Sequence, residues 1–266
     1  MSPLLLLASL ALAADPAFVG TDKPGQKFEE PETHLAAELG GSFTTGNTQN
    51  YAILASLDGD HRWKRNKFTL DLGANLGQSV LDTNADGRVD DIERAAGWAE
   101  TSRKYWADGR YDRFIGDRDS LYLLAGALVD PFAGFDTRTH VQLGYSRIVV
   151  ESETTSLVAE LGVDGAREDF IEGVDPNLAY ILAARAMLGF THKFNENVSF
   201  TDKVEVYENV ITPIDFRLLN QASLTAKLGD KFSLKLSHNL TYDHQPVESF
   251  RPLDQSTTVT FVASIL

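Results

Sequence analysis

The sequence contains no cysteine, and basic residues are scarce in it. Without cysteine there is neither a disulfide framework nor thiolate chemistry. The 24 Lys and Arg residues are outnumbered by 38 Asp and Glu residues, which gives a formal net charge of −14 at pH 7. Because the phosphate backbone of DNA or RNA is bound by basic patches, we expect no nucleic-acid partner.

Long apolar segments are missing beyond the N-terminus. The longest later runs, residues 121–129 and 178–184, have the length of strands. They are too short for a transmembrane helix, which needs about 20 apolar residues. If the chain crosses a membrane, it therefore crosses with β-strands.

The N-terminus carries an apolar run, MSPLLLLASLALA, at residues 1–13. Ala11 and Ala13 form a small-residue site that signal peptidase recognises, so we predict a secretory signal peptide that is cleaved after Ala13 or Ala14. Unlike most such peptides, this one has no Lys or Arg ahead of its apolar run. Residues 14–33, which contain three prolines and show no period, are predicted to be a flexible periplasmic leader.

The clearest pattern lies between residues 216 and 242. Every second residue from Phe216 to Leu228 is mostly apolar and the residues between them are mostly polar, and the alternation resumes from Phe232 to Tyr242 after a short break. A period of two predicts strands, and the break at residues 229–231 predicts a hairpin turn. Each strand has the length that crosses a bilayer core at a tilt, about ten residues.

The same alternation over residues 34–266 predicts an all-β fold, a transmembrane antiparallel up-and-down β-barrel of about 12 strands. The links after even-numbered strands are short, and most links after odd-numbered strands are longer, as in bacterial outer-membrane barrels. Aromatic residues at the strand ends, Tyr207 among them, fit the two headgroup zones. The alternative is a soluble exported β-barrel binding protein with its apolar face inward. Against it, the polar faces carry charges of both signs, Glu160, Arg185 and Glu205 among them, which a wet lumen accommodates.

Three segments resemble the salt-induced outer-membrane protein family, bacterial domains of unknown function. They are GGSFTTGNTQNYAILASLDGDHRWKRNKFTLDLGANLG, ALVDPFAGFDTRTHVQLGYSRI and FSLKLSHNLTYDHQPVESFRPLDQSTTVTFVASIL. The resemblance implies location in the bacterial outer membrane, in contact with lipid and lipopolysaccharide, and insertion by the barrel assembly machinery. Such barrels commonly end in Phe, which that machinery recognises, whereas this chain ends in Leu266.

One link carries a metal-binding motif. Residues 82–93 match the calcium loop D-x-[DN]-x-[DN]-G-x₅-E, with Gly87 at the sharp turn. A hard cation takes six to eight oxygen ligands, which this spacing supplies. The predicted ligands are Asp82, Asn84, Asp86, Arg88 through its carbonyl, Asp90 and Glu93. We therefore predict a calcium-binding, EF-hand-like surface loop of weak affinity, about 10⁻⁴ to 10⁻³ M. The alternative is a solvated acidic loop.

We find little support for catalysis. The six histidines are scattered, and Ser237 and His238 are adjacent on a strand, so they point to opposite faces and cannot form a dyad. The enzymatic alternative is a calcium-dependent outer-membrane lipase. We expect instead a non-enzymatic barrel, either structural or a narrow passive channel for small solutes. A channel would place charged residues along a water path, namely Asp58, Asp71, Arg185, Lys203 and Arg217.

Overall fold

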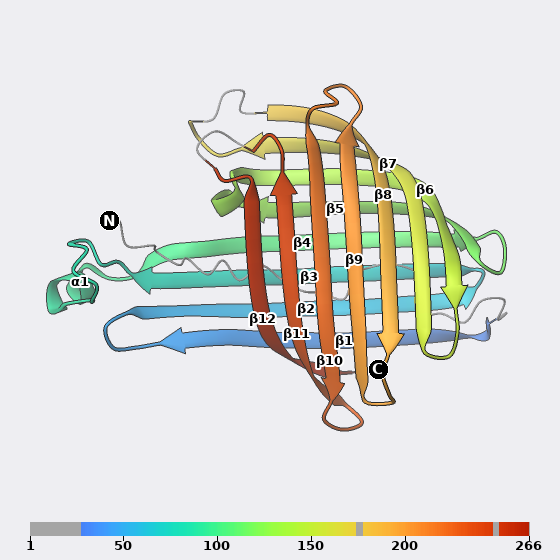
Figure 1. The fold of residues 1–266 in the computed structure, drawn as a ribbon, viewed down its shortest axis with the longest axis horizontal. Coiled ribbons are helices and arrows are strands. Elements are labelled where there is room, and N and C mark those ends of the chain that lie inside the picture. Colours follow the sequence, from blue (N-terminus) through green and yellow to red (C-terminus); the bar gives the residue numbers. More distant parts are fainter. Residues whose placement is uncertain (1–27, 174–177, 247–249, 266) are drawn as a thin grey trace.

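The computed structural model describes residues 28–173, 178–246 and 250–265. They form a closed barrel of twelve antiparallel strands in which each strand pairs with its neighbours in sequence and β1 pairs with β12 (Figure 1). The strands are β1 (Phe28–Thr44), β2 (Gln49–Lys64), β3 (Asn66–Val80), β4 (Ala99–Phe114), β5 (Asp119–Asp130), β6 (Phe135–Glu151), β7 (Thr155–Phe170), β8 (Leu178–Lys193), β9 (Val198–Asn209), β10 (Phe216–Lys227), β11 (Phe232–Asp243) and β12 (Leu253–Ser264). The predicted architecture is confirmed.

Two short helices lie in the links: α1 (Asp91–Ala96) and a 3₁₀ turn, η1 (Pro131–Ala133). In the described part of the chain, no helix has the length and apolar character required to cross a bilayer. The predicted signal peptide and residues 14–27 of the predicted leader lie outside the described residues. The remainder of the predicted leader is a strand, because β1 begins at Phe28 and pairs with β2 through Glu32 and Arg62.

The two ends of the barrel differ in their links. At one end, here the turn end, the links are residue 65 and residues 115–118, 152–154, 194–197 and 228–231. At the other end, here the loop end, they are residues 45–48, 81–98, 131–134, 171–177, 210–215 and 244–252. This sorting of short and long links follows the prediction. In Figure 1, α1 lies at the loop end of β3, beyond the body of the barrel.

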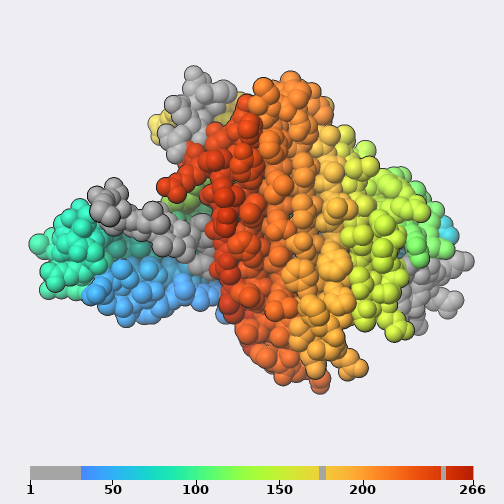
Figure 2. Space-filling model, in the orientation of Figure 1, coloured from blue at the N-terminus to red at the C-terminus, as the bar shows by residue number. Residues whose placement is uncertain are grey.

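The alternating residues sort to opposite sides of the wall. The outward side chains are apolar and exposed, as at Leu161 and Val163, with 66% and 50% exposure. The inward ones are polar and buried, as at Glu160, Asp164 and Arg185. The alternative with an inward apolar face is therefore wrong. In Figure 1, β9–β12 run across the direction of β1–β4 because the strands are tilted in the barrel wall. In Figure 2, β9–β12 form a continuous near face.

Some side chains depart from the simple pattern of outward aromatic residues. Tyr207, expected in an aromatic belt, points inward and donates a hydrogen bond to Glu205. Phe114 also lies inside, with the Arg62 guanidinium 4.4 Å from its ring centre. Arg147 is the opposite exception, because it stands on the outer side at the turn end and bonds Asp119 on the adjacent strand.

Strand register places a continuous row of inward positions around most of the barrel. The row follows directly opposed residue pairs from β4 to β11: Asp112, Tyr122, Gly144, Gly162, Arg185, Tyr207, Arg217 and Asp243. Because the strands are staggered, the row starts near the turn end and finishes at the loop end. It carries most of the polar contacts described below.

Candidate functional site in the charged lumen

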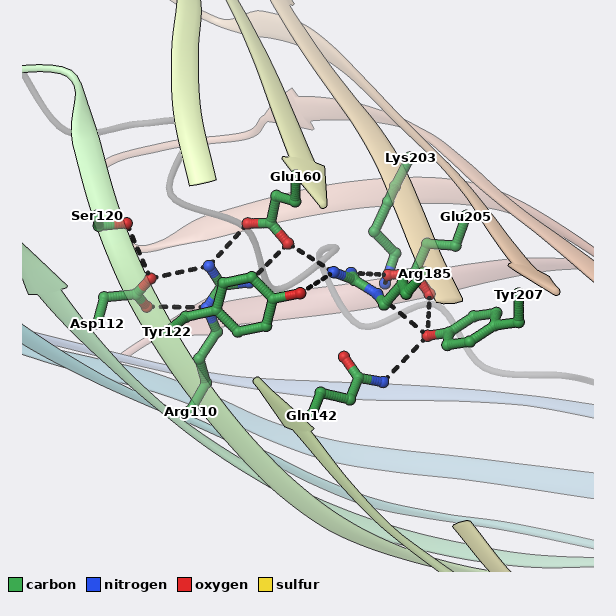
Figure 3. A network of polar contacts seen from close by, with 10 residues as sticks. All are labelled: Arg110, Asp112, Ser120, Tyr122, Gln142, Glu160, Arg185, Lys203, Glu205 and Tyr207. Atoms are coloured by element: carbon green, nitrogen blue, oxygen red, sulfur yellow. Dashed lines mark hydrogen bonds and ion pairs between the residues drawn. The ribbon is translucent and has the colours of Figure 1, made fainter. Parts of the chain in front are cut away.

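A network of ten polar side chains, here the central network, crosses the lumen (Figure 3). It consists of Arg110, Asp112, Ser120, Tyr122, Gln142, Glu160, Arg185, Lys203, Glu205 and Tyr207. These residues come from β4 to β9, so the network ties six strands together. The side chains of Arg110, Asp112 and Glu160 are at most 2% exposed, so they are shielded from solvent.

Two arginines carry the central network. Arg110 donates two hydrogen bonds to Asp112, both 2.8 Å long, and two to Glu160, of 2.7 and 3.1 Å. Arg185 donates to Glu160 at 2.8 Å and to Glu205 at 2.5 Å. The bidentate fork of arginine suits such carboxylate pairing. Glu160 therefore lies between two guanidinium groups, and the chain of ion pairs runs across the lumen.

Tyr122 is held flat against the wall by two glycines. A Cβ atom on Gly144 or Gly162 would lie 2.5 or 2.6 Å from the Tyr122 hydroxyl oxygen. Only glycine leaves room for the ring to reach across β6 and β7. The hydroxyl then accepts a hydrogen bond of 2.8 Å from Arg185. The Arg110 guanidinium lies 4.3 Å from the ring centre, within the range of a cation–π contact.

A second cluster, here the loop-end cluster, consists of Arg138, Glu168, Arg217 and Asp243. Arg217 bonds Glu168 at 2.5 Å and Asp243 at 2.8 Å, and Arg138 lies 3.2 Å from Glu168. Arg217 is the second residue of β10 and Asp243 is the last residue of β11. The cluster therefore stands at the loop end of the lumen, whereas Arg110 and Asp112 stand near the turn end.

A cavity of about 270 Å³ lies inside the barrel, with walls that include Arg185, Lys203 and Arg217. Asp71 and Trp106 form part of its wall, and the indole nitrogen of Trp106 donates a 2.6 Å hydrogen bond to Asp71. Four of the five charged residues expected along a water path, all except Asp58, thus line one space. The polar lining and the size fit a small polar solute.

Two inward side chains, Trp106 and Asp108, lie against glycines of the neighbouring strands. A Cβ on Gly73 would collide with Trp106 at 1.6 Å, so the indole lies across β3 to reach Asp71. Asp108 similarly covers Gly126, and its carboxylate is 3.3 Å from the His140 imidazole. These glycines let large inward side chains lie along the wall, which keeps the cavity open.

The predicted calcium loop closes on itself through hydrogen bonds. Gly87 adopts φ +88°, a conformation that favours glycine. Asp82 accepts hydrogen bonds from the Asp86 and Gly87 N–H groups at 3.2 and 2.8 Å, and Asn84 accepts from Asp86 at 2.9 Å. The loop therefore makes the tight turn that the motif requires.

The Glu93 side chain reaches back from the end of the loop to its start. It accepts hydrogen bonds from the N–H groups of Thr83, Asn84 and Asp90 at 2.6, 3.2 and 3.1 Å. The N–H of Asp90, with those of Thr83 and Asn84, holds the pKa of the Glu93 carboxyl below its usual range. Asp90 caps α1 by accepting from Ile92 and Glu93. Among the described residues, no three His, Asp or Glu side chains are spaced to hold a metal ion.

The loop is docked on the turn between β1 and β2. The Val89 N–H donates a 2.6 Å hydrogen bond to the Asn47 carbonyl, and Arg94 donates one of 3.2 Å to the Gly46 carbonyl. Val89 is buried. Residues 45–48, which belong to the first segment that resembles the salt-induced family, therefore support the loop from a neighbouring strand pair.

The adjacent residues Ser237 and His238 do not contact each other through their side chains. Ser237 is buried on the inner side, whereas His238 stands outside, with its ring nitrogen 2.9 Å from the Thr257 hydroxyl. The geometry agrees with the expectation that the two side chains point to opposite faces.

Comparison with known proteins identifies the family of the chain and one relative. A family profile described as "Protein of unknown function, DUF481" matches residues 37–265. The chain belongs to this family. The uncharacterized protein YdiY of Escherichia coli (strain K12) is 25% identical over 245 residues, which cover 92% of this chain and 87% of YdiY.

Solved barrels are similar in fold. The NanC porin structure matches with a TM-score of 0.52 and 12% identity, over 87% of this chain and 100% of NanC. The translocator domain of the autotransporter NalP from Neisseria meningitidis matches over 89% of this chain and 88% of its own, with 12% identity and a TM-score of 0.45. At 12% identity the likeness to the NanC porin concerns the β-barrel fold alone.

Several network members were not singled out from the sequence. Arg110, Asp112, Tyr122 and Arg138 belong to the interior clusters, and Tyr207 was assigned to the wrong face. The parity of the alternation contained the signal for Tyr122, because Leu121 and Leu123 on either side of it face outward. The partners of each charge depend on register and stagger between strands, which alternation within one strand does not specify.

Proposed function

We propose that the protein is a non-enzymatic integral barrel of the bacterial outer membrane whose lumen is a narrow passage for small polar solutes. The observation that carries the proposal is the charged cavity of about 270 Å³ inside a wall with an apolar outer surface. The central network narrows the turn side of that cavity through buried ion pairs. A purely structural barrel is the competing proposal.

The barrel wall supports the membrane location. Exposed leucines, valines and aromatic residues cover its outer side. In water, so large an apolar surface would drive aggregation, whereas lipid tails and lipopolysaccharide would cover it. Fractionation of cells should recover the protein with the outer membrane, and the folded form should migrate differently from boiled protein on a gel. A mature chain that remains a monomer in detergent-free buffer would contradict this location.

Conductance in planar bilayers tests the passage. We expect wild-type protein to give small steps, and Arg185→Ala to give larger ones because it removes the side chain that joins Glu160 to Glu205. Arg167→Ala is the matched control, since Arg167 is an exposed arginine on β7 that pairs with Asp169 and has no part in the central network. It should conduct like wild type. If neither wild type nor Arg185→Ala gives steps, the lumen is sealed and the barrel is structural.

We also propose that residues 82–93 bind Ca²⁺ weakly, through Asp82, Asn84, Asp86, the Arg88 carbonyl, Asp90 and Glu93. The turn at Gly87 and the all-oxygen donor set support this assignment. To bind the ion with both carboxylate oxygens, Glu93 must exchange the hydrogen bonds that it accepts from three N–H groups in this structure. This exchange is one physical reason to expect the weak extracellular range, about 10⁻⁴ to 10⁻³ M.

Calcium titration of purified protein by calorimetry tests the loop. Asp82→Ala and Glu93→Ala should each abolish the saturable heat signal. Asp91→Ala is the control, because this acid lies in the same segment, is 99% exposed and occupies no ligand position. Equal uptake of calcium by wild type and both ligand variants would show that the acidic loop is merely solvated.

A further inference from the structure

The cations on the cavity wall already have carboxylate partners. Each of the five Lys and Arg residues that line the cavity lies within 3.3 Å of an Asp or Glu oxygen. The pairs are Lys104 with Asp130, Arg138 with Glu168, Arg185 with Glu160, Lys203 with Glu205, and Arg217 with Asp243. The positive charges of the wall are therefore balanced within the protein.

One carboxylate on the same wall has neither a hydrogen bond nor an ion pair among the described residues. Asp164 on β7 is 1% exposed, lines the cavity, and has no hydrogen-bond partner for either carboxylate oxygen, whereas Asp71 accepts from Trp106 and Asp108 lies beside His140. Arg138 and Arg217 line a smaller pocket together with Asp164, but both pair with Glu168. Burying an ionised carboxylate without a hydrogen-bond donor is costly, so this position calls for a donor from outside the chain.

A second acceptor stands beside Asp164. Gln142 lies directly opposite it on β6, lines the same cavity, and donates its amide N–H to Tyr207 at 3.1 Å. Its amide oxygen has no hydrogen-bond partner in the described chain. Three acceptor oxygens, two on Asp164 and one on Gln142, thus remain unpaired on neighbouring strands. A ligand that satisfies them must offer several N–H or O–H donors.

We propose that the cavity is a binding site for a small solute that carries a protonated amine, with the Asp164 carboxylate and the Gln142 amide oxygen accepting its N–H donors. An ammonium group fits better than a neutral hydroxyl because it both donates and compensates the unpaired charge. Trp106 and Tyr207, also on the wall, offer aromatic faces that attract cations. The inference rests on the proposed hydrated lumen.

The volume limits the solute. A space of about 270 Å³ holds several water molecules. It is large enough for a small solute such as an amino acid or an amino monosaccharide. The site is therefore a passage or holding point for a monomeric amine.

Three monosaccharides of matched ring size make a direct test: glucosamine, glucose and glucuronate. Binding is measured by calorimetry on full-length protein in detergent micelles, so that it does not depend on conductance. We expect glucosamine to bind at least about tenfold more tightly than glucose, and glucuronate to show no binding. Equal binding of glucose and glucosamine, or preference for glucuronate, would overturn the proposal.

Asp164→Asn assigns the preference to the residue. It should lower glucosamine affinity about tenfold or more while the folded form keeps its heat-dependent gel shift. Its unfolding midpoint should be unchanged or higher, because the variant removes an unpaired buried charge. Asp169→Asn, an exposed position on the same strand, is the control and should bind like wild type.

The results separate this site from the proposed passage. Glucosamine binding without conductance would keep the site and refute the channel, whereas conductance with no glucosamine binding would do the reverse. If Asp164→Asn lowers the unfolding midpoint and leaves glucosamine binding intact, Asp164 has a purely structural role and the site assignment falls.

Discussion

Removal of the Arg185 side chain should destabilise the barrel by about 3 kcal/mol, at the lower end of the 3–5 kcal/mol typical when one partner of a buried ion pair is deleted. Arg185 is 2% exposed at its side chain and bonds Glu160 and Glu205. After Arg185→Ala, Glu160 keeps its two bonds from Arg110, and Glu205 keeps Lys203 at 3.3 Å. These remaining partners place the expected loss at the low end of that range.

The assay is reversible urea unfolding in lipid vesicles, followed by tryptophan fluorescence, with Glu205→Gln and the double variant measured alongside. Because Arg185→Ala leaves the Glu205 charge with fewer partners, adding Glu205→Gln should cost less than it does in wild type. The expected coupling is about 1–2 kcal/mol. A loss below about 1 kcal/mol for Arg185→Ala, or strict additivity in the double variant, would refute the claim that these groups act as one buried network.

Two further predictions concern other parts of the chain. Gly162→Val would place a Cβ atom 2.7 Å from the Leu143 carbonyl oxygen, so the free energy of unfolding should fall by about 1–3 kcal/mol in the same urea assay; an unchanged value would contradict the claim that only glycine fits beside Tyr122. Trp106→Phe removes the 2.6 Å hydrogen-bond donor to Asp71 and should lower the free energy of unfolding by about 1–3 kcal/mol. The fluorescence of the two remaining tryptophans measures this loss, and no loss would mean that water replaces the indole as the donor.

The number of strands and the faces of the wall follow from the sequence because successive residues of a strand point alternately to the outside and to the lumen. Leu161 beside Glu160 illustrates the rule, since the first is 66% exposed and the second 1% exposed. The start of β1 could not be placed in the same way. Residues 28–33 contain Glu30 and Pro31 and show no alternation, yet Phe28 and Glu32 pair with β2, with a register shift between them. Pairing across strands overrides the local pattern there.

The interior site was predictable only in part. The sequence indicated that Arg185 and Glu205 face the lumen, but not that Arg185 bonds Glu160 on the adjacent strand. That contact depends on Tyr122 crossing Gly144 and Gly162, because the ring fills the space beside both side chains. Glycine weakens a strand, so the sequence of one strand does not explain Gly144 or Gly162. Their role in making room for Tyr122 is seen only when the neighbouring strands are aligned.

The uneven pairing of charges in the lumen bears on what the barrel is for. Buried charges add little to stability even when paired, and an unpaired one subtracts from it. The Glu160 and Glu205 carboxylates each have two cationic partners, whereas the Asp164 carboxylate has no hydrogen-bond partner among the described residues. Asparagine at position 164 would have nearly the same shape without the charge. A barrel with only a structural role would gain from that exchange, so a carboxylate that faces a cavity of solute size argues for a ligand that supplies the missing charge.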